Sequence, residues 1–283
     1  MKFAGLKYNV STNIGDEIQS IAADRFLPRI DQQFDRDSMV KQYPDEPHVI
    51  ILNGWYSHFP KRCFVPHENF KPVIYGFHMS DWHPANVEHF LSEPCIEYFK
   101  ANGPIGCRDR RTRDLLIEKG VDAFFSNCIT LTLEKRPKEP SAPRVFLVNM
   151  KGIDIPKKIA QNALVVEQDT QDIFGPNIKR QMGHRLLDLY RANAGLVVTT
   201  RLHCALPCIA MGIPVVFIGD PKNYRLSPLQ EVGLPIYEDI ADVDWNPGSL
   251  NIDEIKKESI ARLESLIADR LTREGSAPEL ANE

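Results

Sequence analysis

Short apolar runs alternate with helical patterns of apolar and polar positions along most of this chain. The apolar runs predict buried strands at residues 49–52, 73–75, 105–107, 145–148, 164–166, 196–198 and 215–218. Apolar residues at helical spacing predict helices that begin near Asp16 and Arg108, and two more at residues 178–193 and 252–271. Strands that alternate with helices are typical of parallel sheets, so we expect an α/β fold.

A charged segment at residues 134–144 divides this pattern into two halves. It holds three prolines and shows no apolar periodicity, as expected of a linker. We therefore predict an N-terminal domain at residues 1–138 and a C-terminal domain at residues 144–272. The last helix is free to pack back onto the first domain, and the polar tail at residues 273–283 is predicted to be disordered.

The composition is that of an ordinary globular protein. Of its 283 residues, 43% are hydrophobic and 25% are charged, which leaves room for two domains. A formal net charge of −4 argues against a nucleic-acid partner. No apolar stretch is long enough to cross a bilayer, and the start MKFAGLKYNV lacks the apolar region of a signal peptide. We therefore expect a cytoplasmic protein whose six cysteines are free thiols.

Neither the histidines nor the cysteines form a convincing metal site. Six of the eight histidines lie between residues 48 and 89, but without the spacing that two ligands on one helix need. Cys204 and Cys208 are four residues apart on a predicted helix, with no second pair to match them. We predict no metal.

The turn after residues 196–198 carries the strongest chemical signal. Thr199, Thr200, Arg201 and His203 place hydroxyls, a fixed cation and an imidazole where a strand leads into a helix. A helix start of this kind binds anions readily. The same turn is also compatible with a capping threonine, a solvated arginine and a structural histidine.

With Gly212 and Pro214 downstream, the turn Thr200-Arg201-Leu202-His203 resembles the marker of the polysaccharide pyruvyl transferase family. The resemblance implies two Rossmann-like domains similar to those of B-type glycosyltransferases, with a cleft between them. It also implies an enzyme that joins phosphoenolpyruvate to sugar hydroxyls as a pyruvyl ketal.

Two earlier turns also resemble the family in the same order along the chain. Asn13, Gly15 and Asp16 match its Asn-x-Gly-Asp turn, and Arg108 with Asp109 matches its Arg-Asp/Glu turn. By residue type alone, the first is an ordinary helix-capping turn. Arg108 lies at the carboxyl end of a predicted strand, where open α/β sheets bind ligands.

Two further groups of residues are candidates for substrate contacts. Trp55 and Trp82 would suit a sugar-facing surface, although plain core or loop packing is the commoner explanation for such residues. Lys222 and Arg225 follow a strand end and would reach a phosphate unless they are ordinary solvated cations. The sequence departs from the family at Asn53-Gly54-Trp55, where a turn of three glycines is usual.

The resemblance implies roles for the candidate catalytic residues. Arg108 and Arg201 would clamp the carboxylate and phosphate of phosphoenolpyruvate from opposite domains, because arginine offers a fork of fixed donors. His203 would be the acid, and Asp16 would accept the hydroxyl proton or orient the acceptor. Asn13, Gly15 and Thr200 would bind substrate. The reaction needs no metal or other cofactor, since phosphoenolpyruvate is itself the donor.

The acceptor would be a sugar, an oligosaccharide or a lipid-linked glycan, which leaves peripheral association with the membrane biosynthesis machinery open. Two other functions stay open. One is a B-type glycosyltransferase that uses a nucleotide sugar, for which Glu231 and Glu238 lie about where such enzymes carry a glutamate pair. The other is a catalytically silent protein that binds sugars or anions.

Overall fold

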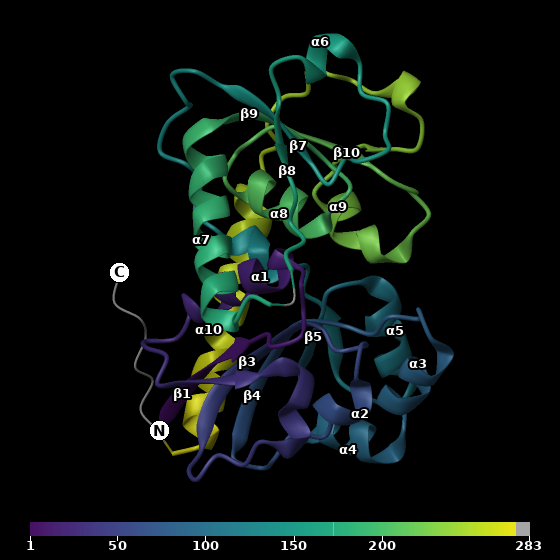
Figure 1. The fold of residues 1–283 in the computed structure, drawn as a ribbon. Coiled ribbons are helices and arrows are strands. Elements are labelled where there is room, and N and C mark those ends of the chain that lie inside the picture. The colour runs from purple at the N-terminus through teal and green to yellow at the C-terminus, as the bar shows by residue number, and fades with distance from the viewer. Residues whose placement is uncertain (172, 276–283) are drawn as a thin grey trace. The chain divides into compact units, whose positions relative to one another are not determined.

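The structure is a computed structural model that describes residues 1–171 and 173–275. It contains two parallel sheets and confirms the predicted α/β class (Figure 1). The chain divides into two compact units. The first comprises Met1–Val10, Gln19–Ile129 and Ser259–Glu283, and the second comprises Ser11–Ile18 and Thr130–Glu258. The predicted domains are each one continuous stretch of chain. In the structure, Ser11–Ile18 belongs to the second unit and Ser259–Glu283 to the first.

The first unit is built on a six-stranded parallel sheet with the order β2-β1-β3-β4-β5-β6. Its strands are β1 (Lys2–Lys7), β2 (Gln32–Asp35), β3 (His48–Trp55), β4 (Phe70–His78), β5 (Ile105–Cys107) and β6 (Ala123–Phe125). Almost every residue of β3 and β4 is buried, which explains their nearly continuous apolar sequence. The short edge strands β2 and β6 were not predicted, because neither carries a buried apolar run.

Helices cover the first sheet. They are η1 (Arg36–Lys41), α2 (Pro60–Cys63), α3 (Pro84–Phe90), α4 (Glu93–Ala101), α5 (Arg110–Glu118) and part of α1 (Ile14–Asp24) and α10 (Asp253–Arg273). The centre of this core is aromatic. The ring of Phe77 lies 5.5 Å from that of Phe64 and 5.5 Å from that of Phe90, both in edge-to-face geometry. Such pairs contribute about 0.5–1.5 kcal/mol each beyond the area they bury.

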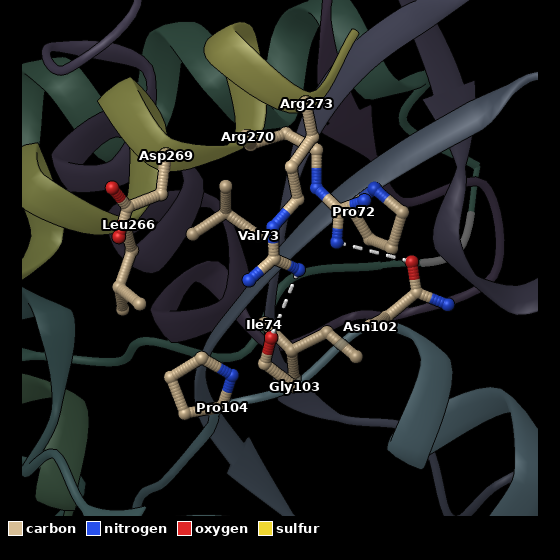
Figure 2. A pocket seen from close by; sticks show the side chains of 10 residues that line it. All are labelled: Pro72, Val73, Ile74, Asn102, Gly103, Pro104, Leu266, Asp269, Arg270 and Arg273. Atoms are coloured by element: carbon tan, nitrogen blue, oxygen red, sulfur yellow. Dashed lines mark hydrogen bonds between the residues drawn. The ribbon is translucent and has the colours of Figure 1, made fainter.

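The last turns of α10 are anchored to the amino-terminal side of β5 (Figure 2). Arg270 donates from Nη2 to Asn102 Oδ1 at 3.1 Å, and Arg273 donates from Nη1 to the carbonyl oxygen of Gly103 at 3.3 Å. The pocket beside these contacts has a volume of about 20 Å³, room for a single water. The tail predicted to be disordered begins at residue 273, but Arg273 is the last residue of α10. Residues 276–283 of this tail lie outside the described residues.

The second unit is built on a five-stranded parallel sheet with the order β11-β10-β9-β7-β8. Its strands are β7 (Arg144–Val148), β8 (Leu164–Val166), β9 (Ala194–Thr199), β10 (Val215–Ile218) and β11 (Ile236–Tyr237). Its complete helices are α6 (Lys157–Ala160), α7 (Pro176–Asn193), α8 (Leu202–Ala210), η3 (Tyr224–Leu226), α9 (Ser227–Glu231) and η4 (Ile240–Asp242). The chain between the two sheets also forms η2 (Ile129–Thr132).

The two sheets share one rule of strand order. In each, the first strand lies between the second and the third, so β1 lies between β2 and β3, and β7 lies between β8 and β9. Each sheet therefore has a point where the strand order changes direction, and ligands of open parallel sheets bind outside the carboxyl ends of the strands at such points. None of the described helices is long and apolar enough to span a membrane.

Candidate active site

The change of strand order in the second unit falls between β7 and β9. The residues directly after these strands are Asn149 and Thr200, and the Thr200 hydroxyl donates to the carbonyl oxygen of Asn149 at 3.3 Å. Thr199, fully buried at the end of β9, accepts a hydrogen bond at Oγ1 from the backbone N–H of Arg201 at 2.9 Å. These bonds hold the Thr200-Arg201-Leu202-His203 turn at the place where a ligand of such a sheet is expected.

A proline in α8 shapes the backbone at His203. Pro207 has no N–H, so it cannot donate the usual helical hydrogen bond to the carbonyl of His203, four residues earlier. Instead Gln168 donates to that carbonyl from Nε2 at 3.5 Å. The backbone of His203 departs from helical values, with φ −86° and ψ 19°. The proline therefore releases the first turn of α8 from regular geometry and ties it to the segment after β8.

The Asn13 turn belongs to the second unit and lies against the same segment. Asn13 forms an antiparallel bridge with Asp169, and the N–H of Ile14 donates to the carbonyl oxygen of Gln168 at 2.8 Å. A Cβ added to Gly15 would come within 2.8 Å of the Cβ of His203. The Asn13 turn and the Thr200–His203 turn, which lie far apart in the sequence, are thus brought into contact.

Replacing Gly15 with alanine is expected to lower turnover about tenfold, because the new methyl group must displace His203 and small misplacements in active sites are costly. The change suits helix propensity, so a loss would come from the contact and not from the helix. Initial rates with saturating substrate would measure it. Gly175→Ala is the matched control, since a Cβ there meets nothing within 4 Å. Full activity in the Gly15 variant would contradict the prediction.

Asp16 is held within the second unit. Its Oδ2 accepts from the hydroxyl of Ser11 at 2.6 Å, and its side chain is buried. The carbonyl oxygen of Ser11 in turn accepts from Nζ of the buried Lys179 on α7 at 2.7 Å. Lys179 was not predicted from the sequence. These two hydrogen bonds, from Lys179 to Ser11 and from Ser11 to Asp16, hold the segment that leads into α1.

Arg201 makes an ion pair with Asp169, another residue that was not predicted. The same oxygen, Asp169 Oδ2, accepts from Nδ2 of Asn149 at 2.8 Å, and that amide also donates to Glu167 Oε2 at 2.8 Å. Asn149 adopts a left-handed backbone with φ 54°, a conformation that asparagine tolerates better than most residues. The arginine fork therefore stands beside a carboxylate whose own position is fixed by hydrogen bonds.

Lys222 and Arg225 lie in the loop after β10. The backbone N–H of Lys222 donates to Asp220 Oδ1 at 2.8 Å, and that of Arg225 donates to Asn223 Oδ1 at 3.1 Å. Both contacts are local turns of the loop. They order the backbone around the two cations, and a role in phosphate binding remains a prediction.

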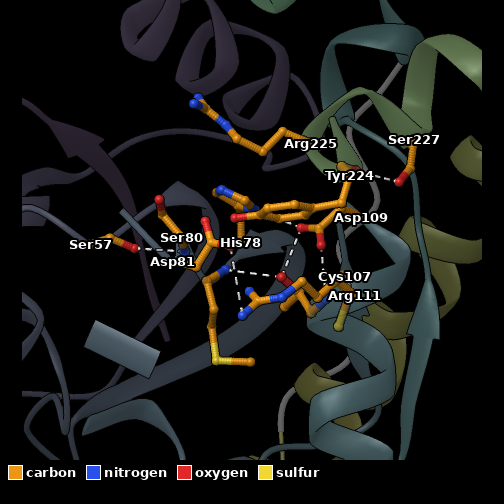
Figure 3. A network of polar contacts seen from close by, with 12 residues as sticks. Ser57, His78, Ser80, Asp81, Cys107, Asp109, Arg111, Tyr224, Arg225 and Ser227 are labelled. Carbon is orange, nitrogen blue, oxygen red and sulfur yellow. Dashed lines mark hydrogen bonds and ion pairs between the residues drawn. The ribbon is translucent and has the colours of Figure 1, made fainter. Parts of the chain in front are cut away.

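In the first unit, polar side chains gather at the carboxyl ends of β4 and β5 (Figure 3). Arg108 follows β5 and is 1% exposed, and its backbone N–H donates to the carbonyl oxygen of Phe77 at 2.8 Å. Asp109 caps α5, because Oδ1 accepts from the N–H of Thr112 at 2.8 Å. Its Oδ2 accepts from Thr112 Oγ1 at 2.7 Å and contacts Nδ1 of the buried His78 at 2.6 Å.

The His78 and Asp109 pair has a defined electrostatic character. Burial raises the pKa of Asp109, but the hydrogen bond and charge of His78 and the two bonds from Thr112 outweigh it, so the pKa lies below its ordinary value. A carboxylate at Nδ1 also selects the ring tautomer that carries its proton there, which makes Nε2 the acceptor in the neutral ring. The arrangement is that of a buried imidazole whose orientation is fixed by Asp109.

Asp109→Asn is expected to lower the free energy of unfolding by about 1–2 kcal/mol, because an amide places N–H donors against two other donors. The depressed pKa means that the wild-type carboxylate stabilises the fold above its ordinary pKa of about 3.9 and loses this effect as the pH falls through the folded value. The difference between the variants should therefore shrink at acid pH. Urea unfolding at several pH values measures it. Asp114→Asn, on the exposed face of α5, is the control. Equal stability of both variants at neutral pH would count against the prediction.

Trp55 and Trp82 lie together in the first unit with His58 between them. The ring centroids of Trp55 and Trp82 are 5.9 Å apart, and His58 lies 4.5 Å from the first and 5.6 Å from the second. Trp82 is 71% exposed. Trp55 ends β3, so this aromatic cluster forms at the carboxyl ends of the strands. An exposed aromatic face of this kind suits the apolar face of a sugar ring.

Sequence reasoning missed His78, Asn149 and Asp169. Asn149 and His78 stand at strand ends, and Asp169 follows β8 closely, yet each is a common residue without a spacing motif. A polar residue just after an apolar run was the available signal. This signal points to a site only when two polar residues lie at or just after the ends of strands that are neighbours in the sheet, as His78 and Asp109 do for β4 and β5.

Comparison with known proteins gives both a family and a fold. The family model for polysaccharide pyruvyl transferase matches residues 13–221, a segment that begins at the Asn13 turn and includes the Thr200–His203 turn. None of the curated proteins matches the chain. Among solved structures, a functionally uncharacterized protein from Klebsiella pneumoniae subsp. pneumoniae has a TM-score of 0.53 and 16% identity, covering 84% of this chain and 93% of its own, so the two share a fold. From the family match, this chain belongs to the polysaccharide pyruvyl transferase family.

Proposed function

We propose that this protein transfers the pyruvyl group of phosphoenolpyruvate onto two hydroxyls of a sugar in a cell-surface polysaccharide or exopolysaccharide. The product is a pyruvate ketal, and phosphate is released. One observation carries the proposal: the Asn13 turn and the Thr200–His203 turn meet at the change of strand order between β7 and β9. There an arginine fork and an imidazole stand at the start of α8. Family membership supports the same reaction.

Phosphoenolpyruvate carries a carboxylate and a phosphate, and arginine binds both in a planar, two-bond geometry that lysine cannot offer. We assign Arg201 of the second unit to one of these groups and Arg108 of the first unit to the other. Thr200, Asn13 and Gly15 contribute hydroxyl, amide and backbone groups near the arginine of the second unit. Lys222 and Arg225 add positive charge in the loop that follows the next strand of the sheet.

The reaction proceeds by protonation and addition. A proton joins C3, so the methylene becomes a methyl group and C2 takes on oxocarbenium character. A sugar hydroxyl adds at C2 and loses its proton, the bond between C2 and the phosphate oxygen breaks, and a second hydroxyl closes the ketal with loss of its own proton. We propose His203 as the acid that delivers a proton to the substrate or to the leaving phosphate. Asp16 orients the acceptor or accepts a hydroxyl proton.

For the acceptor, we propose the aromatic cluster of Trp55, His58 and Trp82 as a sugar-binding surface. The acceptor is a sugar, an oligosaccharide or a lipid-linked glycan. Because phosphoenolpyruvate is a cytoplasmic metabolite, we place the reaction in the cytoplasm, at the inner face of the membrane when the acceptor is lipid-linked.

An acceptor panel tests the proposal. Purified protein would be incubated with phosphoenolpyruvate and galactose-, mannose- or glucose-type acceptors. Phosphate release and the methyl signal of the ketal in NMR spectra would be followed. Phosphate release should require an acceptor. One class of sugar should give a ketal in an amount equal to the phosphate released. Thermal protection by a uridine nucleotide with none by phosphoenolpyruvate would favour a glycosyltransferase instead. Binding of phosphoenolpyruvate without release under any acceptor would favour a silent binding protein.

A further inference from the structure

Asp169 joins three parts of the second unit at the proposed site. Its side chain pairs with Arg201 and accepts from the amide of Asn149, while its backbone bridges Asn13. The neighbouring Gln168 also contacts Ile14, Asn149 and His203, but it reaches only the backbone of the Thr200–His203 turn, whereas Asp169 pairs with the Arg201 side chain. A residue so placed controls the geometry of the arginine fork.

The carboxylate of Asp169 is itself held in place. Asn149 accepts from the backbone N–H of Gln168 through Oδ1 at 2.8 Å, which leaves its NH₂ group to donate to Asp169 and Glu167. The orientation of this amide is therefore determined by its hydrogen bonds. The carboxylate meets donors on two sides, from Asn149 and from Arg201.

The value of this arrangement lies in binding and not in stability. Arg201 and Asp169 have side chains 38% and 41% exposed, and ion pairs in water contribute little to the free energy of folding. A free arginine has many rotamers, however, and fixing it before a ligand arrives removes an entropic cost of binding. Asp169 engages Nη2, and the guanidinium has five N–H donors, so others are left for an anion.

We propose that Asp169 is a positioning residue that holds Arg201 ready to bind the anionic donor substrate. This inference rests on the proposed function for the identity of the donor, although anion binding by itself can be tested separately. The sign of the effect is diagnostic. Removing a negative charge beside an anion site should strengthen anion binding by simple electrostatics, whereas losing the positioning contact should weaken it.

The test compares Asp169→Asn with Glu167→Gln. Both changes remove one negative charge that faces the Asn149 amide, but only Asp169 pairs with Arg201. We expect Asp169→Asn to raise KM for phosphoenolpyruvate about five- to tenfold, with kcat within about threefold of wild type. The Kd for inorganic phosphate, measured by calorimetry, should rise by a similar factor. Glu167→Gln should change each value less than twofold, and Asp169→Glu should recover part of the loss.

Thermal unfolding of each variant shows that the fold is intact. Tighter phosphate binding in Asp169→Asn would mean that Asp169 competes with the ligand and would overturn the proposal, as would equal effects in both charge-neutralising variants. If wild-type protein releases no phosphate from phosphoenolpyruvate yet Asp169→Asn alone weakens phosphate binding, the proposed reaction fails and the positioning role stands. If wild type turns over and phosphate binding is unchanged in the variant, the positioning role fails alone.

Discussion

Replacing His203 with glutamine is expected to lower kcat for pyruvyl transfer by about two to four decades, with the affinity for phosphoenolpyruvate kept within a few fold. Glutamine can donate a hydrogen bond from a similar position, but it cannot transfer a proton. Since C3 must be protonated and phosphate must leave, loss of the acid should affect the chemical step far more than binding. Single-turnover phosphate release with the best acceptor would separate the two.

His184→Gln provides the control for this change. His184 lies on α7 of the same unit and is exposed, so its replacement should leave kcat within about twofold of wild type. Wild-type turnover in the His203 variant would make His203 a structural residue of the turn. A large rise in KM with unchanged kcat would instead assign the ring to substrate binding.

Arg201→Lys and Arg108→Lys are each expected to cost about 1.5–3 kcal/mol in kcat/KM, roughly 10- to 150-fold. Lysine keeps the charge, so long-range attraction for the anion persists. It loses the planar fork, and with it the pair of parallel hydrogen bonds to a carboxylate or phosphate. Arg201→Lys should also weaken binding of inorganic phosphate, because phosphate alone can occupy that arginine.

Matched controls lie on exposed helix faces of each unit. Arg191→Lys on α7 and Arg113→Lys on α5 change arginines paired with Asp188 and Asp114, respectively, and should leave kcat/KM within about twofold. If both active-site variants kept wild-type efficiency, neither arginine would clamp the donor. If only one of the two variants kept wild-type efficiency, the donor site would belong to the unit that carries the arginine whose replacement lowers it.

The strands formed by short apolar runs were predicted closely from the sequence, although the predicted burial was wrong for β8, an edge strand whose Val165 is 73% exposed. Residues 105–107, 164–166 and 215–218 match β5, β8 and β10 residue for residue. In contrast, β2 reads Gln-Gln-Phe-Asp at the edge of its sheet, where the strand pairs with a neighbour on one side only. Its pairing is set by the neighbouring strand, so a local pattern carries no sign of it.

The sequence also predicted which turns carry candidate chemistry, but not which of them meet. Gly15 and His203 come together only because residues 11–18 pack with the second half of the chain, a long-range contact that no local spacing encodes. The pairing of Arg201 with Asp169 has the same origin, since β8 and β9 flank β7 on opposite sides. Helical periodicity likewise predicted the length of α10 but not the residues it contacts, Asn102 and Gly103.

The anchoring of α10 has a consequence for biosynthesis. Arg270 and Arg273 bond to Asn102 and Gly103, so the first unit is completed by residues that are translated after the Thr130–Glu258 segment of the second unit. The stretch from Thr130 to Glu258 must be translated in between, which takes roughly 6–26 s at about 5–20 residues per second. During that time the apolar sites that receive Leu263 and Ile267 are uncovered on the nascent chain. Emergence of α10, and not emergence of the first sheet, is therefore the moment at which this unit can become protease-resistant.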